Sequence, residues 1–356
     1  MTKHTNGRFA AGVGPVMVTG GAGYIGAHVV DLLVGSGVPV VVVDDLSTGR
    51  PERLPADVPL MEVDLAAPGA ATALLSIMRI YRIEAVVHLA AHKQVAESVR
   101  RPAWYYRQNV DGLLALHDAM AQARVHRLVF SSSAAVYGDV AARPEGAAGA
   151  VGEDAIPEPI SPYGQTKLAG EWLNRAAYGA WGLRAVNLRY FNVAGAARPG
   201  LADPGISNLI PMVFAGLARG EAPRIFGGDY PTSDGTCVRD FVDVRDLAAA
   251  HVAALGYLDT AMRHGEVFNV GTGRGASVAE VVEVIGAVTG WLIEPVVVDR
   301  RAGDPASVVA DVSRIRAAMD WRAERSLEDM VRSAWSGWCE QVGRPTAPAP
   351  ARRVAG

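Results

Sequence analysis

The chain has 356 residues, half of them hydrophobic and a fifth charged, which is typical of a soluble globular protein with one large domain or two smaller ones. Its net charge of −3 argues against a nucleic-acid partner, and no apolar run approaches the roughly 20 residues that a membrane span needs. With Cys237 and Cys339 as the only cysteines, we expect neither a disulfide framework nor a metal site, and a reducing cytoplasm is the plain interpretation.

The two ends of the chain differ from the rest. The first 21 residues place basic side chains before an apolar stretch, as a signal peptide does, but glycines interrupt that stretch and it runs into a phosphate-binding motif. We therefore expect no export. Residues 1–14 and 344–356 are expected to form disordered tails.

Between these tails, short β-branched segments alternate with helical patterns. Apolar strands separated by helices indicate a parallel sheet covered on both faces, in a doubly wound α/β fold. The first five strands are expected at residues 16–20, 38–44, 84–90, 127–133 and 183–190.

The regular alternation of strands and helices ends after Phe191, where a loop-like stretch and shorter elements follow. Another strand of the main sheet is expected at 266–273, and a short strand at 294–299 follows helical patterns. We infer two domains, a larger one made of 15–190 plus 240–273 and a smaller α/β one made of 191–239 plus 274–343.

A glycine-rich loop, TGGAGYIG, follows the first predicted strand and opens a helix. Gly20, Gly23 and Gly26 lack side chains, so backbone N–H groups can approach a pyrophosphate at the helix N-terminus. The next strand ends in Asp44, and a carboxylate there accepts hydrogen bonds from a ribose and repels a 2′-phosphate, which favours NAD over NADP. A tight turn and a helix cap are the alternative readings of these residues.

The segment SPYGQTKLAGEW starts at Ser161 with a predicted helix cap followed by a proline. Tyr163 and Lys167 would then lie one turn apart on one face of the helix. The pair is either an acid/base pair or a core tyrosine beside a snorkelling lysine. Three serines, 131–133, end the fourth core strand, where ligands bind in doubly wound sheets, although loop capping is the plainer reading of any one of them.

Together, the loop TGGAGYIG, the serine at the strand end and the Tyr-x-x-x-Lys motif resemble the extended short-chain dehydrogenase/reductase family. Within it the chain is most similar to the UDP-glucose 4-epimerases. The resemblance runs from residue 16 to about residue 320 and is carried by the segments 86–112, 131–139, 161–171, 188–196, 225–248 and 300–311.

The resemblance implies an NAD-dependent 4-epimerase that interconverts UDP-glucose and UDP-galactose through a transient 4-ketone. Tyr163 would be the base, Lys167 and the cationic nicotinamide would lower its pKa, and Ser133 would bond the reacting oxygen. A UDP-glucuronate/UDP-galacturonate 4-epimerase, another UDP-sugar enzyme of the family, a net dehydrogenase and a non-catalytic NAD-binding regulator remain as alternatives.

The resemblance also assigns binding residues. The expected cofactor-binding residues are Gly20, Gly23, Tyr24, Ile25, Gly26, Asp44, Asp45, Asp64, Leu65, Leu89, Ala90, Lys93, Asn109, Ser131, Tyr163, Lys167, Tyr190 and Phe191. The expected substrate-binding residues are Lys93, Ser133, Tyr163, Asn192, Asn208, Leu209, Arg239, Arg301, Asp304 and Ser307. The alternatives are a turn acid for Asp64, a surface lysine for Lys93, a backbone-bonding role for Asn109 and surface salt bridges for the arginines.

Three departures from the family pattern are informative. Ala134 and Ala135 stand where related dehydratases carry acidic residues, so that chemistry lacks its acid and base. Ser307 stands where some epimerases carry a tyrosine, and we hypothesise that the extra room admits UDP-N-acetylhexosamines. Asp243 stands where the family often has histidine, for which the sequence offers no account. The resemblance further implies a homodimer joined by helices that pack as a bundle.

Overall fold

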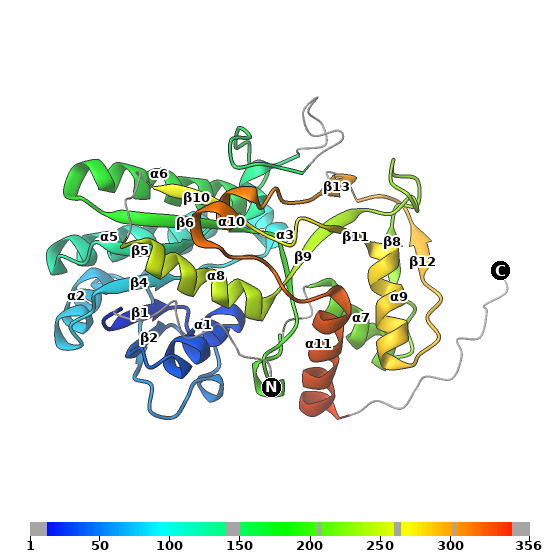
Figure 1. The fold of residues 1–356 in the computed structure, drawn as a ribbon, viewed down its shortest axis with the longest axis horizontal. Coiled ribbons are helices and arrows are strands. Elements are labelled where there is room, and N and C mark those ends of the chain that lie inside the picture. The colour runs from blue at the N-terminus through cyan, green and yellow to red at the C-terminus, as the bar shows by residue number, and fades with distance from the viewer. Residues whose placement is uncertain are drawn as a thin grey trace.

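The computed structural model describes residues 13–139, 150–203, 205, 208–259, 265–301 and 304–343 (Figure 1). Most of the two predicted tails, residues 1–12 and 344–356, lies outside these ranges. Val13, which was assigned to the N-terminal tail, packs against the main core. Across the described ranges, no helix has the length and apolar character to cross a membrane.

Within the described residues, the main sheet has seven strands, all paired in parallel. Its spatial order is β10 (Glu266–Val270), β6 (Arg184–Tyr190), β5 (Arg127–Ser131), β4 (Ala85–His88), β1 (Val16–Thr19), β2 (Val40–Asp44) and β3 (Leu60–Glu62). The central strands β1, β2, β4 and β5 are buried at every position, as expected of apolar strands covered on both faces. The predicted doubly wound α/β fold is therefore confirmed.

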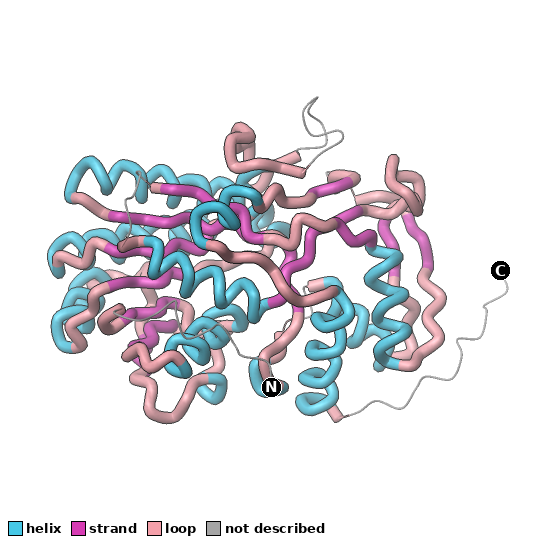
Figure 2. The backbone as a smooth tube through the Cα atoms, viewed as in Figure 1, coloured by secondary structure: helices cyan, strands magenta, loops and turns pink. Residues whose placement is uncertain are grey.

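Helices cover both faces of this sheet (Figure 2). One face packs against α1 (Tyr24–Gly35), α8 (Val244–Tyr257) and α10 (Ser313–Met319), and the other against α2 (Ala70–Ile80), α5 (Gly112–Ala123) and α6 (Pro162–Trp181). Alternate residues of each strand enter the two clusters: Val16 and Val18 face α1, while Met17 faces α2 and α5. The sheet is thus the shared wall of two apolar cores.

A second, smaller α/β part lies at the other end of the molecule (Figure 1). β9 (Val238–Asp243) pairs with β11 (Gly275–Ser277), β13 (Ser307–Val308) and β7 (Asn192–Ala194), and β8 (Arg224–Phe226) pairs with β12 (Val296–Val298). Here α7 (Leu209–Ala218), α9 (Val278–Thr289) and α11 (Leu327–Val342) pack with β9 into a third core.

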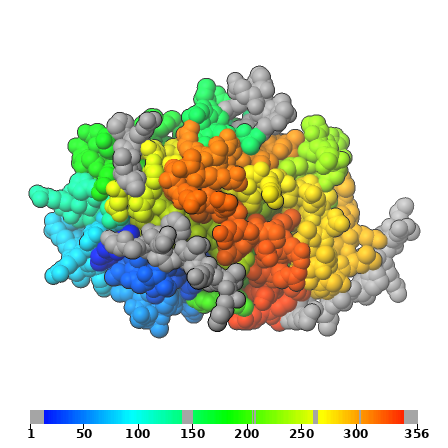
Figure 3. Space-filling view, viewed as in Figure 1, coloured from blue at the N-terminus to red at the C-terminus, as the bar shows by residue number. Residues whose placement is uncertain are grey.

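The segment that carries α10 does not belong to the smaller part, although the predicted division placed all of 274–343 there. Ala310, Val312, Ile315 and Trp321 pack into the core beneath α8 and β10. In the space-filling view this segment lies against α8 and β10 and leads into α11 (Figure 3). The chain therefore crosses between the two parts more often than predicted.

The remaining helical elements connect the strands of the main sheet and the two parts. They are α3 (Val95–Arg100), α4 (Pro102–Tyr106), the π-helical turn η3 (Arg107–Asp111) and the 3-10 turns η2 (Pro51–Arg53), η4 (Ala134–Tyr137) and η6 (Pro199–Leu201). The elements α4, η3 and α5 follow one another directly.

Candidate active site

The glycine-rich loop is packed too tightly for side chains. Gly20 has a positive φ of 71°, and a Cβ there would lie 2.6 Å from the backbone nitrogen of Ala90. A Cβ on Gly26 would lie 2.1 Å from the carbonyl oxygen of Gly20. The bare backbone at the start of α1 therefore has the form that binds a pyrophosphate.

Asp44 holds this loop in place. Its carboxylate is buried at the end of β2 and accepts hydrogen bonds from the backbone N–H groups of Ala22 at 3.0 Å and Leu46 at 2.9 Å. Burial raises the pKa of Asp44, and these two hydrogen bonds act in the opposite direction. Asp44, which was predicted to bind a ribose, thus also holds the backbone around the phosphate loop. This second role is the one expected of a turn residue, the alternative given for Asp44.

Asp45 and Asp64 are exposed and each closes a local turn. Asp45 accepts hydrogen bonds from the backbone and the hydroxyl of Ser47, and Asp64 accepts one from the backbone of Ala66. Such Asx turns are common after strands. Both side chains nevertheless line the cleft described next.

A single cleft at the carboxyl ends of the strands brings the predicted cofactor residues together. It is lined by Gly20, Gly23, Tyr24, Ile25, Gly26, Asp44, Asp45, Asp64, Leu65, Leu89, Ala90, Lys93, Tyr163, Lys167 and Tyr190. The phosphate loop and the Tyr-x-x-x-Lys motif therefore share one cavity. The structure does not place Asn109, Ser131, Ser133 or Phe191 in its lining.

The cleft also contains residues that the sequence did not single out. Ser47 and Thr48 lie two and three residues after Asp45, so their position beside the cleft could have been predicted from the end of the strand. Arg53 carried no such signal: its buried guanidinium donates to the carbonyl oxygens of Ala22 at 3.4 Å and Ala202 at 3.3 Å. It links the phosphate loop to the segment that follows η6.

The helix start predicted at Ser161 is observed. Its hydroxyl accepts a hydrogen bond from the backbone N–H of Gly164 at 3.2 Å, and Pro162 is the first residue of α6. Tyr163 and Lys167 consequently lie on one face, both almost fully buried, with the lysine nitrogen 6.0 Å from the centre of the phenol ring. The Lys167 ammonium donates to the carbonyl oxygen of Ser131 at 2.7 Å.

The electrostatics of this pair depend strongly on burial. Burial raises the pKa of Tyr163, and a hydrogen bond with Ser133 lowers it in part. Burial lowers the pKa of Lys167 from 10.5 to about 7. Lys167 alone therefore does not give the depressed phenol pKa that was predicted, and a further positive charge in the cleft is needed to ionise Tyr163 near neutral pH.

The serines at the end of β5 have different environments. Ser133 is half-buried and its hydroxyl caps η4 by accepting from Ala135 at 3.2 Å. The Ser131 hydroxyl lies 2.8 Å from the ring of His251, and the Ser132 hydroxyl donates to Glu171 at 2.5 Å. Ser131 and Ser132 are both fully buried and, like Ser133, lie outside the lining of the cleft, although all three serines were expected to emerge at the cofactor crevice.

Asn109 bonds its neighbours rather than opening into the cleft. Its amide accepts from the backbone N–H of His92 at 2.9 Å and donates to the His92 carbonyl at 3.0 Å and to Thr166 at 3.1 Å. This is the backbone-bonding alternative. Through it Asn109 fixes the cleft residue His92 relative to α6.

The predicted substrate residues other than Lys93 and Tyr163 lie outside the cofactor cleft, most of them in the smaller part. Arg239 and Asp304 pair with each other at 3.5 Å, and the exposed Arg301 guanidinium lies 3.7 Å from the centre of the Phe226 ring. Asn192 lies exposed on β7, while Asn208 occupies the N-cap position of α7 before Leu209 and donates its side-chain amide to Asp203 instead of capping the helix. Ser307 is exposed, and its neighbour Val308 packs against the main core instead.

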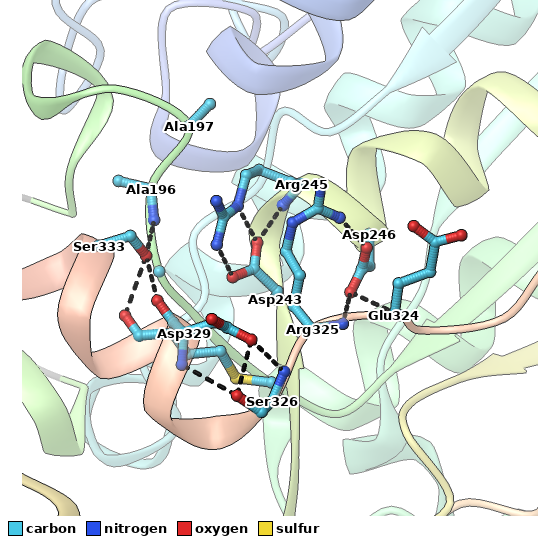
Figure 4. Close-up of polar contacts among 12 residues, drawn as sticks. Ala196, Ala197, Asp243, Arg245, Asp246, Glu324, Arg325, Ser326, Asp329 and Ser333 are labelled. Carbon is cyan, nitrogen blue, oxygen red and sulfur yellow. Dashed lines mark hydrogen bonds and ion pairs between the residues drawn. The ribbon is translucent and has the colours of Figure 1, made fainter. Parts of the chain in front are cut away.

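The structure supplies an account of Asp243. Its buried carboxylate caps α8 through the backbone of Arg245 at 2.8 Å and pairs with the Arg245 guanidinium at 2.8 and 2.6 Å (Figure 4). A Cβ on Gly195 would lie 2.6 Å from this carboxylate. Beside it Asp246 pairs with Arg325. The Asp243–Arg245 pair is local to the start of α8, whereas the Asp246–Arg325 pair joins α8 to the segment before α11.

A doubly wound sheet with a glycine-rich phosphate loop, together with a buried tyrosine and lysine one turn apart in the same cleft, defines a dinucleotide-binding enzyme of the short-chain dehydrogenase/reductase type. The chain belongs to the NAD dependent epimerase/dehydratase family, whose sequence profile matches residues 16–271.

Individual relatives narrow this class. The chain is 46% identical over 344 residues to UDP-glucose 4-epimerase of Azospirillum brasilense, which covers 94% of this chain and 95% of that protein. The structure superimposes on UDP-glucose 4-epimerase from Brucella ovis in complex with NAD, with a TM-score of 0.84, 38% identity and coverage of 93% and 99% of the two chains. UDP-glucose-4-epimerase from Stenotrophomonas maltophila, solved with NAD and formylated UDP-arabinopyranose, gives a TM-score of 0.84 at 37% identity over 92% and 98%. The resemblance inferred from the motifs is thereby confirmed.

Proposed function

We propose that the protein is an NAD-dependent epimerase that interconverts UDP-glucose and UDP-galactose at C4. The observation that carries this proposal is the single cleft that joins the phosphate loop at Gly20 and Gly26 to Tyr163 and Lys167. The similarity to UDP-glucose 4-epimerases over nearly the whole chain supports it.

The residues of the cleft fit NAD. Because Gly20 and Gly26 carry no side chains, the backbone N–H groups at the start of α1 can approach a pyrophosphate, and Asp44 lines the same cleft, where it would accept from a ribose. When bound, NAD would supply the hydride acceptor for oxidation at C4 and, once reduced, the hydride donor for reduction of the ketone.

The chain's own residues manage the proton. Tyr163 removes the proton of the 4-hydroxyl as a phenolate and returns it when the ketone is reduced. Ser133 bonds Tyr163, and its hydrogen bond lowers the phenol pKa. The buried Lys167 ammonium, held on the Ser131 carbonyl, adds positive charge when protonated.

The smaller part is proposed to hold the UDP group. Arg239 and Arg301 present planar guanidinium groups that match phosphate oxygens, and Asp304 is placed beside Arg239 to accept from a ribose hydroxyl. Asn192, Asn208, Leu209 and Lys93 complete this proposed subsite. Tight binding through UDP would leave the sugar free to present both faces to Tyr163.

A coupled assay tests the function. UDP-galactose, UDP-GalNAc and UDP-galacturonate are each supplied as sole substrate, and the 4-epimer and NADH are measured. We expect UDP-glucose to form from UDP-galactose without net NADH. Tyr163→Phe should abolish turnover while NAD binding persists, whereas the exposed Tyr106→Phe should keep full activity. Net NADH formation without an epimer would instead indicate a dehydrogenase.

We propose that acetylated substrates are also turned over, because Ser307 stands where some epimerases carry a tyrosine. Ser307 is exposed on β13, so a larger side chain fits there without disturbing the core. Undetectable turnover of UDP-GalNAc in the same assay would end this proposal. Ser307→Tyr should reduce acetylated turnover selectively if it is correct.

We propose a homodimer through α4, α5 and α6. Tyr106, Leu114 and Trp172 are exposed on these helices, and the Tyr106 hydroxyl bonds Gln165 of α6 at 3.1 Å, so the apolar side chains share one surface. Large apolar residues exposed on neighbouring helices are typical of an interface. Light scattering measures the mass directly.

A further inference from the structure

An ion pair is buried between the main sheet and α6. Glu171 on α6 bonds the Arg189 guanidinium of β6 at 2.9 and 2.6 Å, and the side chains are only 5% and 4% exposed. The Ser132 hydroxyl donates to the same carboxylate at 2.5 Å. Because burying two charges usually costs about as much as their attraction returns, stability does not explain such a pair.

The pair holds the segment that contains Ser133 at both ends. Before Ser133, the hydroxyl of Ser132 is fixed by Glu171. After it, the ring of Tyr137 lies 4.8 Å from the Arg189 guanidinium, and its hydroxyl donates to Asn269 at 2.7 Å. Ser133 therefore lies between two residues, Ser132 and Tyr137, that both contact the Glu171–Arg189 ion pair.

The pair also belongs to the helix of the proposed base. Glu171 follows Lys167 by one turn of α6 and Tyr163 by two. At this point α6 lies so close to β5 that a Cβ on Gly170 would be 2.5 Å from the Phe130 ring. The pair thus joins the two elements whose side chains must meet for proton transfer.

We propose that Ser132, Glu171 and Arg189 act as a positioning triad that sets the Ser133 hydroxyl against the Tyr163 phenol. This inference rests on the proposed epimerase function of Tyr163. The triad does not touch the substrate and acts only through Ser133 and α6. Displacing a reacting group by about 1 Å costs roughly a hundredfold in rate, which is the scale on which such a triad matters.

Ser132→Ala in the full-length protein with NAD tests the triad, because it removes one hydroxyl and leaves the ion pair intact. We expect kcat with UDP-galactose to fall at least about tenfold, with KM and bound NAD changed less than about twofold. The acid limb of the kcat–pH profile should move to higher pH, since Ser133 lowers the pKa of Tyr163 and its loss raises it. The phenolate absorbance of Tyr163, isolated by subtracting the Tyr163→Phe background, should titrate at higher pH in the same direction.

The pH readout is specific to this phenol. The other ionisable groups described around Tyr163 are Lys167 on its own helix, Tyr190 on β6 and Tyr105 on α4. Ser132→Ala alters none of them. Asn174→Ala is the matched control, because it removes another fully buried polar group of α6, bonded to His117 and Asn187, and should leave the pH profile unchanged.

The outcomes separate the two proposals. An inactive wild-type protein would overturn the epimerase function itself. An active wild type with unchanged kcat and phenol titration in Ser132→Ala would overturn the triad alone. Ser132→Thr keeps the hydroxyl and should retain at least about a third of wild-type kcat. If it loses as much as Ser132→Ala, or if Asn174→Ala shifts the acid limb equally, the triad has no specific role.

Discussion

We predict that the buried Lys167 lowers the free energy of unfolding of the protein. Its ammonium is almost fully buried and has the Ser131 carbonyl as its described hydrogen-bond acceptor. Replacing it with methionine, which has a similar length and no charge, removes the burial penalty. In protein stripped of nucleotide, we therefore expect Lys167→Met to be inactive yet more stable than the wild type at neutral pH.

The size of the effect follows from proton linkage. Burial lowers the pKa of Lys167 from 10.5 to about 7, so the unfolded chain binds this proton more tightly than the folded protein. Unfolding then takes up a proton between about pH 7 and pH 10, and stability rises with pH in that window. These values correspond to a penalty of about 4 kcal/mol at pH 7 and about 2 kcal/mol at pH 9.

Urea unfolding of the wild type and Lys167→Met at pH 7 and pH 9 measures this penalty. The lost hydrogen bond to Ser131 offsets the gain by a constant amount, whereas the charge contribution changes with pH. The stability advantage of the variant should therefore shrink by about 2 kcal/mol between the two pH values. A difference that stays constant would show that Lys167 is not held in an unfavourable state, and would refute the reasoning.

Three further predictions address the cofactor loop, the Asp243 ion pair and the dimer. Gly26→Ala should weaken NAD binding at least about tenfold in a calorimetric titration, because its Cβ would lie 2.1 Å from a carbonyl oxygen, while Gly35→Ala in the same helix meets no atom within 4 Å and should bind normally. Asp243→Asn should lower the free energy of unfolding by about 2 kcal/mol in urea, since an amide can still cap α8 but no longer pairs with Arg245. Trp172→Glu should halve the mass of a dimer in light scattering without changing its circular dichroism.

The main sheet and the cofactor cleft were predictable from local signals. Strands buried on both faces have no polar alternation, so the runs at 40–44 and 85–88 were recognisable by composition alone. The phosphate loop and the helix cap at Ser161 depend on residues only a few positions apart. Residues a few positions apart in the sequence are also neighbours in the folded protein, which is why these motifs could be predicted.

Features that depend on partners distant in sequence were not predictable. Ser132 bonds a carboxylate 39 positions away, and Arg53 reaches a carbonyl 149 positions away. The raised pKa of Tyr163 in the chain alone was not predictable either, because it comes from burial, which is a property of the folded chain. The packing of α10 against the larger core was not predictable for the same reason, since its partners on α8 and β10 lie far away in the sequence.

The arrangement of β9 has a consequence for synthesis on the ribosome. Its partners β7, β11 and β13 come from residues 192–194, 275–277 and 307–308, so this small sheet cannot close until most of the chain has emerged. The edge strand β10 likewise joins β6 only after residues 191–265 have been made. A nascent chain released before residue 308 would expose an unpaired strand edge, and we expect such fragments to be degraded or to aggregate rather than to survive as a smaller working enzyme.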